Sequence, residues 1–405
     1  MRATIATVAV LVALATGLAV MQGTPGWYQW RGPNRDGHSA ETGLLKEWPS
    51  QGPPRVWSTT GAGIGYSSFS ASGGRLYTLG VRGKTEFVIA FDEATGRRVW
   101  ETSNGQRFDN EQGDGPRSTP TVDGDQIYAL GASGDLSCLD ATTGKIVWTR
   151  NLLREFGGDN APYGISESPL VTGDRVLVNA GGPKASVVAL NKATGATLWR
   201  SQGDEAGYSS AVLAQVGGSQ QAIFFTARRA LGVDVRDGKL LWSYPRVSNT
   251  TANIATPVVN GTRVFLSSDY GTGAALLELS PSGAREVYFT REMRNHHSSS
   301  VLVGDYLYGF SSSILTAMRF SDGSVAWRDR SVGKGSVIYA DQRLYLFSEN
   351  GVVGLAEASP TAYREHGRFR IEAKSGPTWT HPIITGGKLI LRDQDNVYAY
   401  DVRQR

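Results

Sequence analysis

Hydrophobic and polar residues alternate along this chain in short runs, separated by turns that contain glycine. The clearest unit spans 90–100 (Ala-Phe-Asp-Glu-Ala-Thr-Gly-Arg-Arg-Val-Trp), with one strand ending at Asp92, a tight turn closed by Gly96 and a second strand ending on Trp100. Asp and Thr side chains bond local backbone groups in such turns, and glycine takes the positive φ that the reversal needs. The pattern predicts β-hairpins whose terminal tryptophan covers the neighbouring hairpin.

The unit recurs along the chain. Close copies span 138–148 and 189–199, and weaker copies span 234–242 and 320–327. Repeats of about 40–50 residues made of short strands are typical of β-propellers. We therefore predict an all-β fold, an eight-bladed β-propeller of four-stranded antiparallel blades. The expected outer-strand aromatics, one for each blade, are Trp57, Trp100, Trp148, Trp199, Trp242, Tyr288, Trp327 and, in a degenerate seventh copy, Phe369.

The two ends of the repeat region complement each other. The strand 55–59 carries Trp57 without a preceding turn, whereas Ala399–Asp401 matches Ala90–Asp92 but is followed by no turn and no tryptophan. We expect the Trp57 strand to complete the last blade, because closure removes two unpaired strand edges. The predicted propeller spans 55–405.

Two segments precede the propeller. Residues 1–23 contain Arg2 and then an apolar run from Ile5 to Val20, which is shorter than the ~20 residues of a spanning helix. This pattern predicts a secretory signal peptide, with an uncleaved membrane anchor as the alternative. We expect a periplasmic or extracellular protein. Residues 24–54 lack periodicity, so we interpret them as a lead-in that packs on the outside of the propeller or across one face.

Composition limits the partners. The chain has 405 residues and a formal net charge of only +4, and no Lys/Arg run is present, which argues against nucleic acid. The single cysteine, Cys138, lies in a predicted core strand, so we interpret it as a small core residue. One cysteine permits no internal disulfide, and we expect a monomer held together by packing and ring closure.

The turn copies, together with the blade openings 118–124 (Ser-Thr-Pro-Thr-Val-Asp-Gly) and 168–173 (Ser-Pro-Leu-Val-Thr-Gly), resemble quinoprotein (PQQ-type) repeats. These are the repeats of PQQ-dependent dehydrogenases and of the outer-membrane assembly factor BamB. The resemblance makes PQQ a candidate cofactor. However, the larger enzymes carry an adjacent cysteine pair beneath the quinone and bind Ca²⁺ through carboxylate and amide ligands. This chain has one cysteine, and only Glu167 lies in the expected region.

A site is expected where corresponding positions of the blades meet. Three places before each blade's opening position, such as Pro120 or Pro169, the side chain should point to one end of the central channel. We call these eight positions the mouth ring: Tyr66, Arg117, Ser166, Tyr208, Ile254, His297, Lys334 and Trp379. Glu167, one place further on, is expected just inside. Aromatic faces with Arg and Lys suit a flat or anionic ligand, although a polar mouth that holds only water is the alternative.

Two functions remain open. The first is an exported binding or scaffolding module that holds a protein or a small anionic or aromatic ligand at Tyr66, Arg117, Glu167, Tyr208, His297, Lys334 and Trp379. The second is an oxidoreductase similar to PQQ-dependent alcohol dehydrogenases that uses the same mouth. The sequence identifies no catalytic residue. No metal site is predicted, because adjacent strand residues such as His296 and His297 face opposite ways. Membrane contact is expected only if the leader stays attached.

Overall fold

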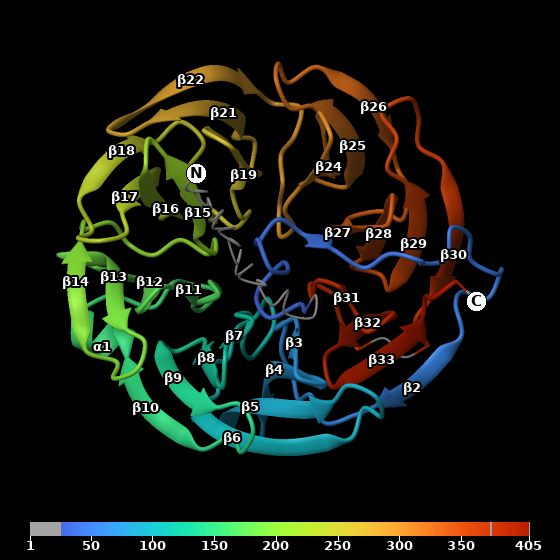
Figure 1. Ribbon diagram of the computed structural model, residues 1–405, viewed down its shortest axis with the longest axis horizontal. Helices are drawn as coiled ribbons and strands as arrows, with labels where there is room; N and C mark the ends of the chain where they lie inside the picture. Colours follow the sequence, from blue (N-terminus) through green and yellow to red (C-terminus); the bar gives the residue numbers. More distant parts are fainter. Residues whose placement is uncertain (1–25, 373–374, 405) are drawn as a thin grey trace, which may run out of the picture.

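Eight sheets of four antiparallel strands radiate from a central axis in the computed structural model, which describes residues 26–372 and 375–404 (Figure 1). Within each sheet the strands lie side by side, with one nearest the axis and the last at the rim. The all-β, eight-bladed prediction is confirmed. The predicted signal peptide, 1–23, lies outside the described residues.

Blades one to four follow one another around the ring. Blade one comprises β3 (Ser70–Ser72), β4 (Arg75–Arg82), β5 (Thr85–Asp92) and β6 (Arg98–Gln106). Blade two comprises β7 (Thr121–Asp123), β8 (Gln126–Leu130), β9 (Asp135–Asp140) and β10 (Ile146–Asn151), followed by the short helix α1 (Leu152–Phe156). Blade three comprises β11 (Leu170–Thr172), β12 (Arg175–Gly182), β13 (Ala185–Asn191) and β14 (Thr197–Ser201). Blade four comprises β15 (Val212–Val216), β16 (Ser219–Phe225), β17 (Ala230–Asp234) and β18 (Leu240–Tyr244).

Blades five to eight complete the ring. Blade five comprises β19 (Val258–Asn260), β20 (Arg263–Ser268), β21 (Gly273–Ser280) and β22 (Gly283–Thr290). Blade six comprises β23 (Val301–Val303), β24 (Tyr306–Ser311), β25 (Ile314–Arg319) and β26 (Val325–Asp329). Blade seven comprises β27 (Gly335–Ala340), β28 (Arg343–Ser348), β29 (Val352–Glu357) and β30 (Glu365–Arg370). Blade eight comprises β31 (Ile383–Thr385), β32 (Lys388–Asp393), β33 (Asn396–Asp401) and β2 (Arg55–Thr59).

Blade eight closes the ring as predicted. Its outer strand β2 comes from the N-terminal part of the chain and pairs antiparallel with β33, with Trp57 opposite Ala399. The indole Nε1 of Trp57 donates to the backbone oxygen of Glu93 in blade one at 3.2 Å. The first and last blades are therefore joined by both a sheet and a side-chain contact.

The outer tryptophans link neighbouring blades. Trp100 Nε1 donates to the Ala141 oxygen at 3.2 Å, and Trp148 Nε1 donates to the Lys192 oxygen at 2.9 Å. Each accepting oxygen lies at the hairpin turn of the following blade, and the turn glycine lies against the same indole. Gly144 has φ 72°, and a Cβ added there would come within 2.6 Å of Trp100. The predicted positive φ of Gly96, Gly144 and Gly195 is confirmed.

The contact between blades four and five departs from this pattern. Trp242 Nε1 donates within its own blade, to Oε1 of Gln221 at 2.9 Å. Gln221 Nε2 in turn donates to the backbone oxygen of Ser280 in blade five at 3.1 Å. The turn 281–282 lacks the Asp-x-x-Thr-Gly pattern, and the glutamine amide bridges the two blades in its place.

The lead-in runs to the centre of the ring, where Figure 1 shows it in blue. Its strand β1 (His38–Ser39) pairs parallel with β27 and adds a fifth strand to blade seven. Arg31 is buried and donates to the backbone oxygen of Ser300 at 2.7 Å. Arg35 is also buried and donates to the backbone oxygens of Ser168 and Ala211, in front of blades three and four. The lead-in thus fastens several blades to one another around the axis.

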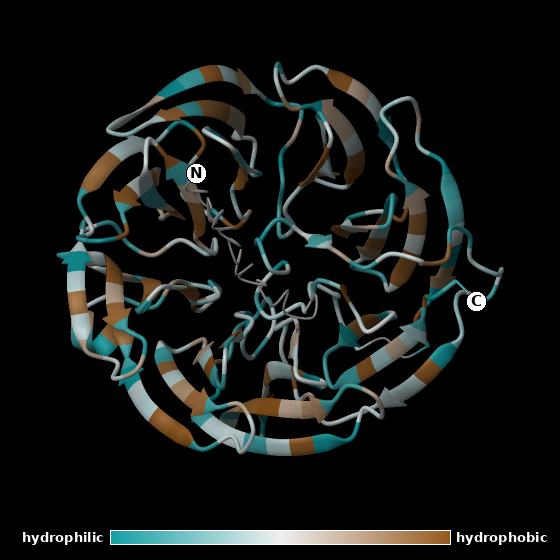
Figure 2. Cartoon of the chain, in the orientation of Figure 1, coloured by the Kyte–Doolittle hydropathy of each residue, from teal (hydrophilic) through white to brown (hydrophobic). Residues whose placement is uncertain are grey.

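Apolar side chains fill the space between adjacent blades, and hydrophobic and hydrophilic bands alternate along the strands in Figure 2. One cluster joins Leu130 and Cys138 of blade two to Val178 and Val188 of blade three. Cys138 is fully buried, as its interpretation as a core residue requires. In the part of the chain that the structure describes, no helix is long and apolar enough to cross a membrane.

Candidate functional site at the channel mouth

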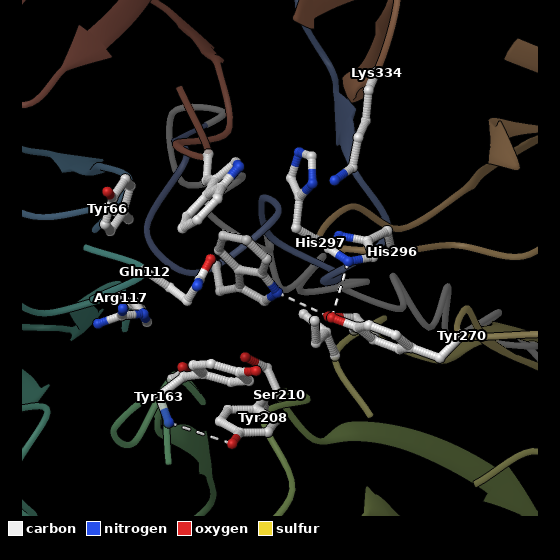
Figure 3. Close-up of a pocket in the computed structure, with 15 residues that line it drawn as sticks. Tyr66, Gln112, Arg117, Tyr163, Tyr208, Ser210, Tyr270, His296, His297 and Lys334 are labelled. Atoms are coloured by element: carbon white, nitrogen blue, oxygen red, sulfur yellow. Dashed lines mark hydrogen bonds between the residues drawn. The ribbon is translucent and has the colours of Figure 1, made fainter. Parts of the chain in front are cut away.

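The mouth ring converges on one cavity of about 350 Å³. All eight of its positions line this cavity, one from the segment that precedes the innermost strand of each blade. Six of the seven site residues predicted from the sequence are among them. Figure 3 shows Tyr66 and Arg117 on one side of the cavity and Lys334 with His297 on the opposite side. Aligning the blades by their opening residues therefore identified side chains that line the cavity. Binding of a ligand there stays a prediction.

Glu167 does not line the cavity. It follows the cavity-lining Ser166, and successive residues of an extended segment face opposite sides. Its side chain is only 1% exposed, and it accepts a hydrogen bond from the backbone amide of Asn179. Burial raises the pKa of Glu167 to about 8, and the positive charge of Arg35 partly offsets this shift. Glu167 is therefore a buried group of the segment before blade three that is not part of the cavity lining.

One wall of the cavity combines two aromatic rings and a guanidinium. The rings of Tyr66 and Trp379 lie 4.8 Å apart, and the Arg117 guanidinium lies 5.4 Å from the centre of the Tyr66 ring. Arg117 donates to the backbone oxygens of Gly113 at 2.7 Å and Gly115 at 2.8 Å, which fixes its orientation. Burial lowers the pKa of Arg117 from its ordinary value, but an arginine remains a cation at neutral pH.

A second wall consists of tyrosines. The rings of Tyr163 and Tyr208 lie 5.6 Å apart, and the Tyr163 amide donates to the Tyr208 hydroxyl oxygen at 3.4 Å. Tyr270 is 44% exposed, and its hydroxyl lies 2.9 Å from Nε2 of His296. Burial raises the pKa of both Tyr208 and Tyr270. These phenols are therefore neutral, and they offer aromatic faces with a polar edge.

A carboxylate from outside the mouth ring lies beside three of its members. Glu349 follows β28, and its Oε1 accepts from Trp379 Nε1 at 2.7 Å. The same oxygen lies 3.0 Å from Lys334 Nζ and 3.5 Å from His297 Nδ1. Blades six, seven and eight thus place these three side chains around one oxygen. Because charge-assisted hydrogen bonds are strong, Glu349 holds Trp379 and Lys334 in place and offsets the charge of Lys334.

The histidines at the mouth are neutral. Burial lowers the pKa of His297 well below its ordinary value, and the positive charge of Lys334 lowers it further. Burial likewise lowers the pKa of His296, and it lowers that of His381 to about 3. Neither ring nitrogen of His297 makes a hydrogen bond within the described part of the chain. Among the described residues, no group of three or more His, Cys, Asp or Glu side chains is placed to hold a metal ion.

Other lining residues were missed by the sequence reasoning. Two of them, Ser210 and Thr256, lie two places after Tyr208 and Ile254, so the period of two could have identified them. The remainder come from segments without a repeat: Trp30, Gln112, Tyr163, Tyr270 and His296. Trp30 of the lead-in donates through Nε1 to Thr256 Oγ1 at 2.9 Å, and its ring lies 4.6 Å from that of His381.

The eight-bladed ring, with an aromatic and cationic cavity at its channel mouth, defines the class of protein: it is a β-propeller of PQQ-type repeats. The chain belongs to the family described as outer membrane protein assembly factor BamB, whose profile matches residues 84–329.

Two curated relatives match part of the chain. The quinohemoprotein alcohol dehydrogenase ADH IIB of Pseudomonas putida is 32% identical over 127 residues, covering 28% of this chain and 17% of that protein. The outer membrane protein assembly factor BamB of Xanthomonas campestris pv. campestris is 33% identical over 107 residues, covering 26% of this chain and 23% of that protein. The matches therefore span less than a quarter of each relative's length.

Solved structures support the fold. BamB from Moraxella catarrhalis has a TM-score of 0.63 at 14% identity, covering 86% of this chain and 99% of that chain. The quinohemoprotein alcohol dehydrogenase ADHIIG from Pseudomonas putida HK5 has a TM-score of 0.53 at 12% identity, covering 94% of this chain and 81% of that chain. At these identities the likeness concerns the fold alone.

The mouth matches the quinone-and-calcium arrangement of the dehydrogenases only in part. Aromatic faces and the Arg117 cation suit a flat, anionic ring system. Calcium takes six to eight oxygen ligands, several of them carboxylates, whereas none of the described residues that line the cavity is acidic. The single cysteine, Cys138, is buried in the core and provides no cysteine pair. The described residues at the mouth therefore do not fit that arrangement.

Proposed function

We propose that this protein is an exported binding module that holds its ligand in the cavity at the channel mouth. One observation carries the proposal: eight side chains at equivalent positions in eight blades meet around a single cavity of about 350 Å³. The description of the family as an outer membrane assembly factor supports a binding role. The apolar run from Ile5 to Val20 supports export.

The lining defines the chemistry of the ligand. The rings of Tyr66, Trp379, Tyr208 and Trp30 offer faces against which a planar group can stack. Arg117 is held in place by two backbone oxygens and still presents positive charge to the cavity. The proposed ligand is therefore planar, aromatic and anionic, either as a free molecule or as part of a partner protein.

A second function, that of a PQQ-dependent alcohol dehydrogenase, is favoured by one observation. The chain is 32% identical over 127 residues to a quinohemoprotein alcohol dehydrogenase. The binding role is the better supported of the two, because the cavity-lining residues that the structure describes include no carboxylate for calcium.

Calorimetric titration of the mature protein with naphthalene-2-carboxylate and with PQQ tests the proposal. We expect naphthalene-2-carboxylate to bind with one-to-one stoichiometry and Arg117→Ala to weaken it at least about tenfold, because one charged hydrogen bond is lost. Arg97→Ala is the matched control, since Arg97 is exposed at a rim turn. Equal losses in both variants, or no binding of either compound, would contradict the proposal. Tight PQQ binding accompanied by dye-linked alcohol oxidation would instead establish the dehydrogenase function.

A further inference from the structure

The cations of the mouth are not equivalent. Lys334 Nζ lies 3.0 Å from Glu349 Oε1, and this pair is partly shielded from water, with side chains 29% and 22% exposed. Glu349 also accepts from the Trp379 indole, which keeps its carboxylate facing the ammonium group. The positive charge of Lys334 is therefore compensated inside the protein.

Arg117 makes no ion pair with a carboxylate in the part of the chain that the structure describes, although the charge of Asp114 acts on it from nearby. Its guanidinium donates to the backbone oxygens of Gly113 and Gly115, which are neutral. The nearby carboxylate of Asp114 is bonded to Arg107, whose Nη2 lies 2.5 Å from Asp114 Oδ2. Arg107 also pairs with Asp109, but that carboxylate is 70% exposed, so water screens its charge. Arg117 therefore presents an uncompensated charge to the cavity.

The remaining titratable groups at the mouth add no charge at neutral pH. The imidazoles of His296, His297 and His381 are neutral because burial lowers their pKa. Tyr208 and Tyr270 keep their phenolic protons. Among the described residues that line the cavity there is no Asp or Glu. The mouth thus carries one net positive charge, and it lies on the Arg117 side.

We infer that the mouth selects a planar aromatic ligand with a single negative charge, placed against Arg117 and Tyr66. This inference rests on the proposed binding function and specifies its ligand. Figure 3 shows Lys334, His296 and His297 across the cavity from Arg117. A second anionic group at that opposite side would meet Lys334, but the Glu349 carboxylate 3.0 Å from Lys334 Nζ repels that group and offsets the attraction. The opposite side therefore suits an uncharged polar group.

A series of naphthalenes that differ only in charge tests the inference: naphthalene-2-carboxamide, naphthalene-2-carboxylate and naphthalene-2,6-dicarboxylate. We expect calorimetry on the wild-type protein at pH 7.5 to find the monocarboxylate bound at least about tenfold more tightly than the other two, the factor of roughly one charge-assisted hydrogen bond. An equal or tighter dicarboxylate would overturn the single-charge inference and leave the binding function intact. No binding of any compound would contradict the binding function itself.

Glu349→Gln sharpens the test. The amide oxygen can still accept from Trp379 Nε1, but the charge that compensates Lys334 is removed. We expect this variant to bind the dicarboxylate at least about tenfold more tightly than the wild type does. The control Glu349→Gln/Lys334→Met removes both charges and should restore the preference for one carboxylate. An unchanged affinity of Glu349→Gln for the dicarboxylate would overturn the inference. If this variant does not fold, the order of the three affinities in the wild-type protein decides.

Discussion

The rim and the mouth of this propeller use the same repeat in opposite ways. At the rim, successive blades place the same residue at the same position, as in Trp57, Trp100 and Trp148. At the mouth, equivalent positions carry chemically different side chains, such as Arg117, Ile254 and Trp379. Each of these three tryptophans meets the hairpin turn of the next blade, so the same residue serves each time. The mouth residues instead share one cavity. Repetition therefore identifies the fold, and the variation at repeated positions identifies the site.

The largest expected effect comes from removing the rim contact that closes the ring. Deletion of 1–60 removes β2, leaves β33 with an unpaired edge and eliminates the buried contacts of Arg31 and Arg35. We expect aggregation and loss of a cooperative thermal transition, since exposed edges pair with other chains. Size-exclusion chromatography and calorimetry measure both, with deletion of 1–25 as the control. A soluble 1–60 deletion with unchanged thermal stability would contradict the closure account.

Acidification should affect the mouth differently from the blades. His381 has a folded pKa of about 3 and an ordinary value near 6.5, so between these pH values only the unfolded chain binds its proton. The contribution of the neutral His381 side chain to the unfolding free energy is fully present above pH 6.5 and declines as the pH falls below that value. Between pH 7 and pH 5, we expect the wild type to lose about 2 kcal/mol more unfolding free energy than His381→Gln loses, because glutamine does not titrate.

Glu86 in blade one provides the opposite control. Burial raises its folded pKa to about 8, so between pH 4.5 and 8 the folded chain binds the extra proton and stability rises as pH falls. The difference between the wild type and Glu86→Gln should therefore change with the opposite sign. Urea denaturation at pH 5, 6 and 7 measures both differences. Slopes of the same sign would refute the assignment of protonation states.

The contact between a rim turn and the neighbouring tryptophan can be tested with two glycines that both have positive φ, only one of which lies against a tryptophan. Gly144 and Gly124 both have positive φ, at 72° and 59°, but only a Cβ at Gly144 would meet another residue, Trp100. Gly144→Val should cost more than ~1 kcal/mol of unfolding free energy, through backbone strain and displacement of the indole. Gly124→Val should cost less, because only the strain applies. Equal denaturation midpoints for the two variants would argue against the blade-to-blade contact.

Changes at the mouth should leave stability nearly unaltered. Arg117→Ala with Lys334→Ala is expected to weaken a singly charged anionic ligand by roughly 1.5–3 kcal/mol, the value of the one charged hydrogen bond that Arg117 supplies, because Lys334 is already paired with Glu349. Both side chains are half-buried at the cavity and lie outside the apolar clusters between the blades. Thermal unfolding and ligand titration of the same preparation measure the two quantities. A large loss of stability in the double variant would mean that these side chains serve the fold.

Much of the architecture follows from the sequence because its causes are local. The Asp-x-x-Thr-Gly turn fixes the hairpins that carry it, and Tyr288 takes the outer aromatic position in blade five although that turn has degenerated. In blade seven, Phe369 pairs with Val353, one pair away from the equivalent position, so the predicted seventh copy is not matched there. The mouth ring could be predicted because equivalent positions in a ring face the same point. Glu349 and Trp30 could not be predicted in this way. Glu349 follows β28 and is not at one of the aligned mouth positions, and Trp30 lies in a lead-in without periodicity. Their roles depend on contacts between blades.

The central claim is that ligands bind at the mouth and leave the rim unaffected, and the tryptophans offer the most direct test. Trp30 and Trp379 line the cavity, whereas Trp100, Trp148 and Trp199 lie at the rim. Nitrogen-15 labelling of tryptophan gives one indole resonance for each, which single Trp→Phe variants assign. On titration with naphthalene-2-carboxylate, the account predicts large shifts for Trp30 and Trp379 and none for the rim indoles. Shifts confined to the rim, or spread equally over both groups, would contradict it.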